Sequence, residues 1–204
     1  MSKLYRKFIK RIFDFSASLL GLMFLFPLFI VIGLLIKLED GGSIFFRQER
    51  VGQNWKTFKI YKFRTMIEGA DKMGSQVTRA DDPRITRIGK FLRRYKLDEL
   101  PQLINIVKGE MSLVGPRPEV LKYAKVYKDD YDEILQVKPG ITDFASLEFK
   151  DENEILKGVQ NVDEVYLKEI LPRKIKLYKK YLKEISFITD LKLIFRTIRG
   201  ILSW

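Results

Sequence analysis

The sequence predicts an α-rich α/β domain that follows an N-terminal membrane helix, and three observations support this prediction. Residues 15–36 hold no charged side chain, residues 43–66 contain two short β-type runs around a turn, and most of the later chain shows helical spacing of apolar residues. A chain of 204 residues suits one domain with its own core. We therefore divide it into a membrane helix at residues 1–40 and one domain at residues 41–204.

The N-terminal run FSASLLGLMFLFPLFIVIGLLI is long enough to cross a hydrocarbon core of roughly 30 Å. Pro27 lies near its middle and is expected to break or kink the helix. Basic residues flank both ends: Lys3, Arg6, Lys7, Lys10 and Arg11 before it, and Lys37, Arg47, Arg50, Lys56, Lys59, Lys62 and Arg64 after it. The positive-inside rule then places both ends in the cytoplasm. We expect a re-entrant, Pro-broken helix in the bacterial inner (cytoplasmic) membrane, with an ordinary single crossing as the alternative.

The next segment predicts a β-hairpin and a covering loop. The runs IFFRQ and FKIYKF are separated by the turn-forming Gly52-Gln53-Asn54. Residues 67–87 are polar and rich in Gly, Asp and Thr, which is typical of a surface loop that can cover a site.

Helices and a short strand are expected after this loop. A helix is predicted at residues 88–96, and a second one begins near Asp98 and stops at Gly109. MSLVGPRPEV predicts a short strand that leads into a proline-stiffened loop, and residues 120–136 a further helix. From about residue 171 to Trp204, apolar residues at helical spacing alternate with Lys and Arg, which favours membrane-interface helices. For the part before Ser186, packing on the domain core is an equal alternative.

Composition limits the chemistry. Lys and Arg number 38 against 26 Asp and Glu, a net charge of +12, so the partners should be anionic. The chain has no Cys and no His, which excludes thiol nucleophiles, Ser-His triads and typical zinc sites. A metal ion would be a hard, oxygen-binding one such as Mg²⁺. Nucleic acid is not expected, because the basic residues are scattered and form no known reader motif.

The strongest candidate site is RRYKLDELPQLINIVKGEMSLVGPRP, at residues 93–118. Asp98 and Glu99 stand there among cations, and the helix N-terminus opposes their mutual repulsion. An ionised Asp98 can act as a nucleophile, and Glu99 can hold Mg²⁺. The alternative is an ordinary helix cap. Pro116 and Pro118 fix the backbone around Arg117, a bidentate phosphate binder, and Lys62 is a further candidate phosphate ligand.

The run DDPRITRIGKFLRRYKLDELPQLINIVKGEMSLVGPRPEV, with FRQERVG and KIYKFRTM upstream, closely resembles the bacterial sugar transferase family, the monotopic phosphoglycosyl transferases. The resemblance covers roughly residues 1–142. It implies a re-entrant membrane helix and a small cytoplasmic catalytic domain with interfacial helices. The implied activity is transfer of a sugar-1-phosphate from a UDP-sugar to polyprenyl (undecaprenyl) phosphate, with release of UMP, as the first membrane step of glycoconjugate synthesis.

By position, the family's Asp-Glu dyad falls on Asp98 and Glu99. The resemblance implies that Asp98 attacks the β-phosphate and holds the phospho-sugar covalently, and that Glu99 helps to bind Mg²⁺. The family's phosphate-binding residues match Lys62, Arg93 and Arg117, with Pro116 and Pro118 around the last of these.

Two departures from the family pattern stand out. Lys96 replaces a common Ser or Thr, and residues 143–150 (DFASLEFK) differ from the usual GLAQVNGR, so the family's Arg in that segment has no match. Two other readings stay open: a membrane-bound glycosyltransferase that releases UDP, and a non-catalytic basic anchor that uses Asp98 only as a cap.

Overall fold

The structure, a computed structural model, describes residues 5–70, 73–75 and 77–202. Lys3 of the basic flank and the terminal Trp204 lie outside the described residues. The strands are β1 (Phe45–Val51), β2 (Thr57–Phe63), β3 (Ser112–Val114) and β4 (Gly140–Thr142). The helices are α1 (Lys10–Asp40), α2 (Arg87–Arg94), α3 (Gln102–Lys108), α4 (Leu121–Val126), α5 (Lys128–Ile134), α6 (Phe144–Glu148), α7 (Glu152–Ile155), α8 (Val162–Val165), α9 (Leu171–Glu184) and α10 (Phe187–Leu202). Short helical turns occupy Tyr5–Ile9, Gln53–Trp55, Leu97–Glu99 and Tyr166–Ile170.

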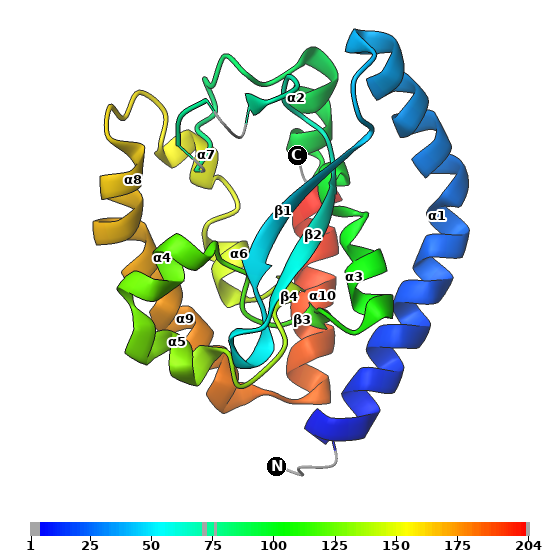
Figure 1. Ribbon diagram of the computed structural model, residues 1–204. Coiled ribbons are helices and arrows are strands. Elements are labelled where there is room, and N and C mark those ends of the chain that lie inside the picture. The colour runs from blue at the N-terminus through cyan, green and yellow to red at the C-terminus, as the bar shows by residue number, and fades with distance from the viewer. Residues whose placement is uncertain (1–4, 71–72, 76, 203–204) are drawn as a thin grey trace.

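Helix α1 runs along one side of the domain and bows outward in its middle (Figure 1). Its helical structure continues through Pro27, and a proline inside a helix is a common cause of such a bend. Among the described residues it is the one helix long and apolar enough to cross a membrane. Its outward face is apolar, since Met23, Phe24 and Leu38 are 68%, 85% and 83% exposed. The re-entrant path stays a prediction.

The N-terminal end of α1 is bound to the domain through α3 and β3. Arg11 donates to the carbonyl oxygens of Ile106 and Val107, at 2.6 and 3.0 Å, where α3 ends. The buried carboxylate of Asp14 accepts a 2.7 Å hydrogen bond from the Ser112 hydroxyl.

The C-terminal end of α1 is bound to the same domain. The Glu39 carboxylate accepts from the backbone N–H groups of Arg87 and Ile88, at 2.7 and 3.1 Å, and so caps α2. Asp40 pairs with Arg64, which follows β2. Both ends of the helix therefore lie against one domain.

The predicted hairpin is confirmed: β1 and β2 pair antiparallel, from Phe45 opposite Phe63 to Val51 opposite Thr57. The turn depends on unusual backbone angles, because Asn54 and Trp55 both have φ near +60°. Asn tolerates this left-handed region better than most residues, which agrees with the turn predicted there.

The chain between β2 and β3 forms two helices with a tight turn between them. Thr86 caps α2 by accepting from the Gly89 N–H. Lys96 then adopts a left-handed conformation (φ 54°, ψ 20°), ends the helix and starts the 3₁₀ turn Leu97–Glu99. Helix α3 follows and stops at Gly109, whose φ is 85°, as predicted.

A second, two-stranded sheet joins distant parts of the chain. Strands β3 and β4 pair parallel, with Ser112 opposite Gly140 and Val114 opposite Thr142. A Cβ on Gly115 would lie 2.6 Å from the Lys138 carbonyl oxygen, so this close approach requires glycine. The predicted helix at residues 120–136 is two helices, α4 and α5, because Tyr127 between them has φ −115° and ψ 46°.

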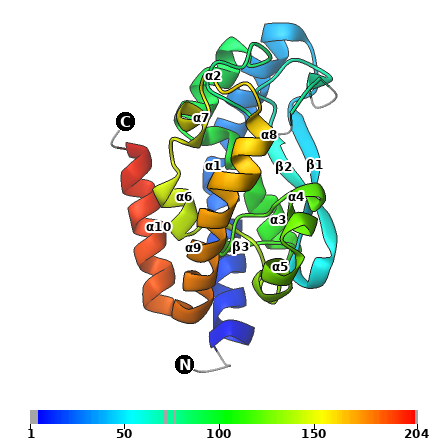
Figure 2. The ribbon, with the colours of Figure 1, turned by 90° about the vertical axis from the view of Figure 1, so that its left-hand side faces the viewer.

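The main core lies among α4, α5, α6 and α9. Leu171, Ile175 and Tyr178 of α9 are buried in it, so the part before Ser186 packs on the core. Helix α10 and the hairpin lie on opposite sides of the molecule (Figure 2). In α10, Leu193 is buried while Ile188 and Phe195 are 78% and 68% exposed. That exposed apolar face agrees with an interfacial helix without establishing one.

Candidate active site

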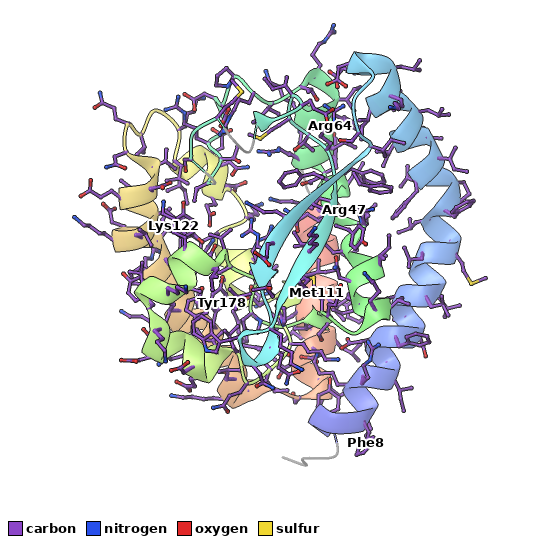
Figure 3. All side chains as sticks on the ribbon, viewed as in Figure 1. Phe8, Arg47, Arg64, Met111, Lys122 and Tyr178 are labelled. Atoms are coloured by element: carbon purple, nitrogen blue, oxygen red, sulfur yellow. The ribbon has the colours of Figure 1, made fainter. Side chains whose placement is uncertain are left out.

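A cavity of about 580 Å³ lies between the hairpin and α10. Arg64, near the top of the view, and Tyr178, on the other side of the hairpin from α1, both line it (Figure 3). Its wall brings together nearly all of the predicted site residues: Lys62, Arg93, Asp98, Glu99, Arg117 and Pro118. Pro116 does not line the cavity; its carbonyl oxygen instead accepts a 2.9 Å hydrogen bond from the Gly140 N–H and helps to fix the loop.

Asp98 lies in the 3₁₀ turn before α3 and is 7% exposed. The residue at the start of α3 is Pro101, and no side chain caps that helix. Within the described ranges, the Asp98 carboxylate forms no hydrogen bond and no ion pair. The interpretation of Asp98 as an ordinary helix cap therefore lacks the hydrogen bond that it requires.

The Glu99 carboxylate, in contrast, contacts two cations. Its Oε1 accepts from Lys62 Nζ at 2.9 Å, and its Oε2 accepts from Arg117 Nη1 at 3.0 Å. Arg117 Nη2 also donates to Oε1, which makes the guanidinium contact bidentate. Bidentate pairs of this kind are among the strongest side-chain hydrogen bonds. Glu99 thus holds two cations in fixed positions beside Asp98.

The two carboxyl groups differ in electrostatics as well. Burial raises the pKa of Asp98 above its usual value; Glu99 raises it further, whereas Lys62, Arg93 and Lys96 oppose the shift. Burial acts in the same direction on Glu99, but Arg117 and Lys62 outweigh it and hold the pKa of that carboxyl well below its usual range. Glu99 is therefore the stably ionised member of the dyad.

Arg93 reaches the cavity from the last turn of α2. Its Nε donates a 2.8 Å hydrogen bond to the Thr65 hydroxyl, which follows β2. Helix α2 approaches Thr65 closely because Gly89 has no side chain: a Cβ there would lie 2.1 Å from the Thr65 carbonyl oxygen. The position of Arg93 thus depends on a glycine one turn earlier in the helix.

The structure adds site residues that sequence reasoning missed. Arg50 donates to the Pro118 carbonyl oxygen at 3.3 Å and pairs with Glu119 at 3.5 Å. The buried Glu119 carboxylate also accepts from the Tyr166 hydroxyl. All three side chains line the cavity. Arg50 lies in the FRQERVG motif, but Tyr166 is far along the chain, so only the fold reveals the contact.

The divergent segment also contributes to the wall. Ala145, Phe149 and Glu152 line the cavity, and Glu152 pairs with Lys174 of α9. The segment in which the sequence departs from the family pattern therefore faces the cavity.

The two carboxylates of the dyad are the candidate ligands for Mg²⁺. Within the described residues, no three carboxylates are grouped as metal ligands. Mg²⁺ usually needs one or two carboxylates, since substrate phosphates supply further ligands. Asp98 is unpaired, and Glu99 Oε2 accepts only from Arg117 among the described residues. The dyad is therefore compatible with a magnesium ion that binds together with a phosphorylated substrate.

This chain is similar to a known protein family and to several named proteins. A family model described as Bacterial sugar transferase matches residues 5–204. The exopolysaccharide production protein ExoY of Sinorhizobium fredii is 34% identical over 94% of this chain and 84% of its own length. Two enzymes named as undecaprenyl-phosphate sugar phosphotransferases are each 35% identical. The UDP-N-acetylgalactosamine enzyme of Aeromonas hydrophila matches over 96% of this chain, and the UDP-glucose enzyme of Escherichia coli over 94%. The chain spans only 44% and 40% of their lengths.

Proposed function

Because the chain belongs to the bacterial sugar transferase family, we propose that it transfers a sugar-1-phosphate from a UDP-sugar to polyprenyl phosphate and releases UMP. The names of two relatives contain a UDP-sugar and undecaprenyl phosphate, which supports this donor and this acceptor. The name of a third refers to exopolysaccharide production, which supports a role early in glycoconjugate synthesis.

The observation that carries the proposal is the Asp98 carboxylate, which has no ion pair within the described residues and lies in a cavity lined by cations. In the first step a carboxylate oxygen of Asp98 attacks the β-phosphorus of the UDP-sugar. The bond from that phosphorus to the bridging oxygen of the α-phosphate breaks, and UMP leaves with the electron pair. The sugar phosphate is then held on Asp98 as an acyl phosphate.

In the second step a phosphate oxygen of polyprenyl phosphate attacks the same phosphorus. The bond to Asp98 breaks, which regenerates the carboxylate and gives a polyprenyl diphosphate sugar. Splitting the transfer in this way lets one phosphate-binding cavity serve both substrates in turn, a ping-pong scheme.

The cations have complementary roles in this scheme. Glu99 holds Lys62 and Arg117 in place before the substrate arrives, so little reorganisation is needed when the pyrophosphate binds. Arg93, positioned by Thr65, supplies positive charge near Asp98. Together these residues attract the donor's phosphates and stabilise the charge that develops on the leaving UMP.

We further propose that Mg²⁺ binds at Asp98 and Glu99 together with the donor phosphates. When bound, the ion would neutralise pyrophosphate charge that the lysine and arginines leave uncompensated.

The contacts of α1 support a proposal for how the protein sits in the membrane. A helix of 31 residues is about 46 Å long, so in a straight crossing its ends would face opposite sides of the bilayer. Both ends are bound to one domain. We propose that α1 enters and leaves the inner membrane on the cytoplasmic side, with its apolar outer face in lipid, and that α10 lies at the interface.

The test is product identity. With a UDP-sugar panel, undecaprenyl phosphate and Mg²⁺, the wild-type protein should release UMP, and Asp98→Asn should reduce the rate by about 1,000-fold or more. Because Asp98 has no ion pair among the described residues, the variant should keep the wild-type thermal stability. Release of UDP would instead identify a glycosyltransferase that moves the sugar alone, and full activity in Asp98→Asn would favour a non-catalytic anchor.

A further inference from the structure

A second hollow, an apolar groove of about 610 Å³, lies between α1 and the domain. One wall is the stripe of α1 that contains Leu22, Phe26, Ile30 and Leu34, each four residues from the next. On the domain side it is lined by Ile44, Phe45 and Ile104. Lys37 is the one charged residue in the described lining, and it lies at the end where α1 returns to the domain.

The groove adjoins the candidate active site. Phe45 lines both hollows. In two other places, residues that are adjacent in sequence line different hollows. Ser43 lines the cavity and Ile44 the groove, while Leu103 lines the cavity and Ile104 the groove. A cavity lined by several cations and an apolar groove therefore adjoin at Phe45.

The groove also opens toward the surface that α1 would present to lipid. Phe26, Ile30 and Leu34 are 63%, 49% and 58% exposed, although they line it. On the inner side of the groove Gly33 packs closely on Ile44, with 3.3 Å from the Cβ position of the glycine to Ile44 Cδ1. A long chain could thus enter from the membrane and end beside the cavity.

We propose that this groove binds the isoprenoid chain of the acceptor next to its phosphate, so that the phosphate enters the cavity at Phe45. The proposal rests on the proposed function, since it assigns the acceptor of that reaction a place. A UDP-sugar is polar throughout and has no part that suits an apolar channel. Polyprenyl phosphate combines one anionic group with a long apolar chain. Its phosphate suits the cavity, which is lined by cations, and its chain suits the apolar groove. The volume lies within the usual range of ligand pockets, about 300–1,000 Å³, and suits only the first part of such a chain.

A matched pair of variants tests the groove by kinetics. Ile30→Trp fills it, whereas Val31→Trp adds the same side chain one residue later, at a position that is 52% exposed and outside the groove lining. Ile30→Trp should raise the KM for undecaprenyl phosphate by about tenfold. It should leave UMP release in the absence of acceptor unchanged, because that half-reaction needs only the donor. Val31→Trp should change neither value, and equal effects of the two variants would overturn the proposal.

Photo-crosslinking tests the same claim without turnover. A polyprenyl phosphate with a diazirine in its first isoprene units should label groove residues of the full-length protein in phosphatidylglycerol vesicles. Unlabelled undecaprenyl phosphate should compete, and added phosphatidylglycerol should not. Equal competition by the phospholipid, or labelling elsewhere, would show that the groove is ordinary lipid-facing surface. If the wild-type protein released no UMP but the groove were labelled with this selectivity, the proposed reaction would fail and the acceptor site would stand.

Discussion

Asp98 and Glu99 are neighbours in sequence, but among the described residues only Glu99 has ion-pair partners. Glu99 contacts Arg117 and Lys62, whereas Asp98 faces the cavity without a partner in the described part of the chain. The sequence placed both in one cationic cluster. It could not assign them separate partners, because Lys62 and Arg117 reach Glu99 from a strand and a loop that are 37 and 18 residues away.

The Glu99 pair should contribute to stability. Arg117→Met leaves the partly buried Glu99 carboxylate with fewer donors and should lower the free energy of unfolding by about 2 kcal/mol. In a double-mutant cycle with Glu99→Gln, the two losses should be less than additive, by about 1 kcal/mol or more. Chemical denaturation in detergent measures both. The exposed pair Lys128 and Asp132 is the control, and its cycle should give no measurable coupling. Additive losses at Glu99 and Arg117 would contradict the contact.

The pH profile should report Asp98. Because the raised pKa keeps more of this carboxyl protonated, the acceptor-free release of UMP should fall as pH decreases, at a higher pH than for an exposed aspartate. Lys96 lowers that pKa, so Lys96→Met should move the acid limb to still higher pH. The control Lys90→Met, an exposed position on α2, should leave the limb unchanged. If both variants shifted the fall in UMP release equally, that fall would reflect the titration of a group other than Asp98.

At the scale of elements, local signals predicted most of the fold. The hairpin, the helices on either side of Lys96 and the stop at Gly109 all follow from turn chemistry and apolar spacing. Strand β4 was missed because its three residues pair with β3, 28 positions earlier, and leave no periodic pattern. The 3₁₀ turn was also missed, since Lys96 adopts φ 54° without being Gly or Asn. The wall formed by residues 143–150 likewise depends on long-range packing.

Helix α2 should tolerate no side chain at Gly89. Gly89→Ala places a methyl group on the Thr65 backbone and should cost about 3 kcal/mol of unfolding free energy. It should also slow UMP release, because Arg93 moves away from Thr65. For stability, the control is Gly200→Ala in α10, where the Cβ meets open space and the helix should gain up to about 1 kcal/mol. Calorimetry that finds both variants equally stable would refute this packing.

At the scale of the molecule, α1 and the domain form one unit. Besides the contacts of Arg11, Asp14, Glu39 and Asp40, the buried Asp190 of α10 accepts from Tyr5, Lys10 and Tyr181. The sequence indicated that both flanks are basic and so predicted both ends on one side. It could not show that acidic residues within the helix would fasten each end to the domain, because their partners lie far along the chain.

Cysteine labelling should show both ends of α1 on the cytoplasmic side. The chain has no cysteine, so Ile9→Cys and Lys37→Cys each provide a single thiol near one end. In inverted inner-membrane vesicles, a membrane-impermeant maleimide should label both, and Phe24→Cys, at the exposed middle of the helix, should be protected by lipid. Lys56→Cys in the hairpin turn is the reference for the domain side. Labelling of one end from the outer side only would establish a single crossing.

Intact-mass analysis of the protein with a UDP-sugar in the absence of acceptor tests whether a phospho-sugar forms covalently on Asp98. We predict a mass increase of one sugar phosphate, which peptide fragmentation should map to Asp98. The increase should be absent in Asp98→Asn and lost when undecaprenyl phosphate is added. An adduct on any other residue, or turnover that releases UMP while direct transfer leaves the protein unmodified, would contradict it.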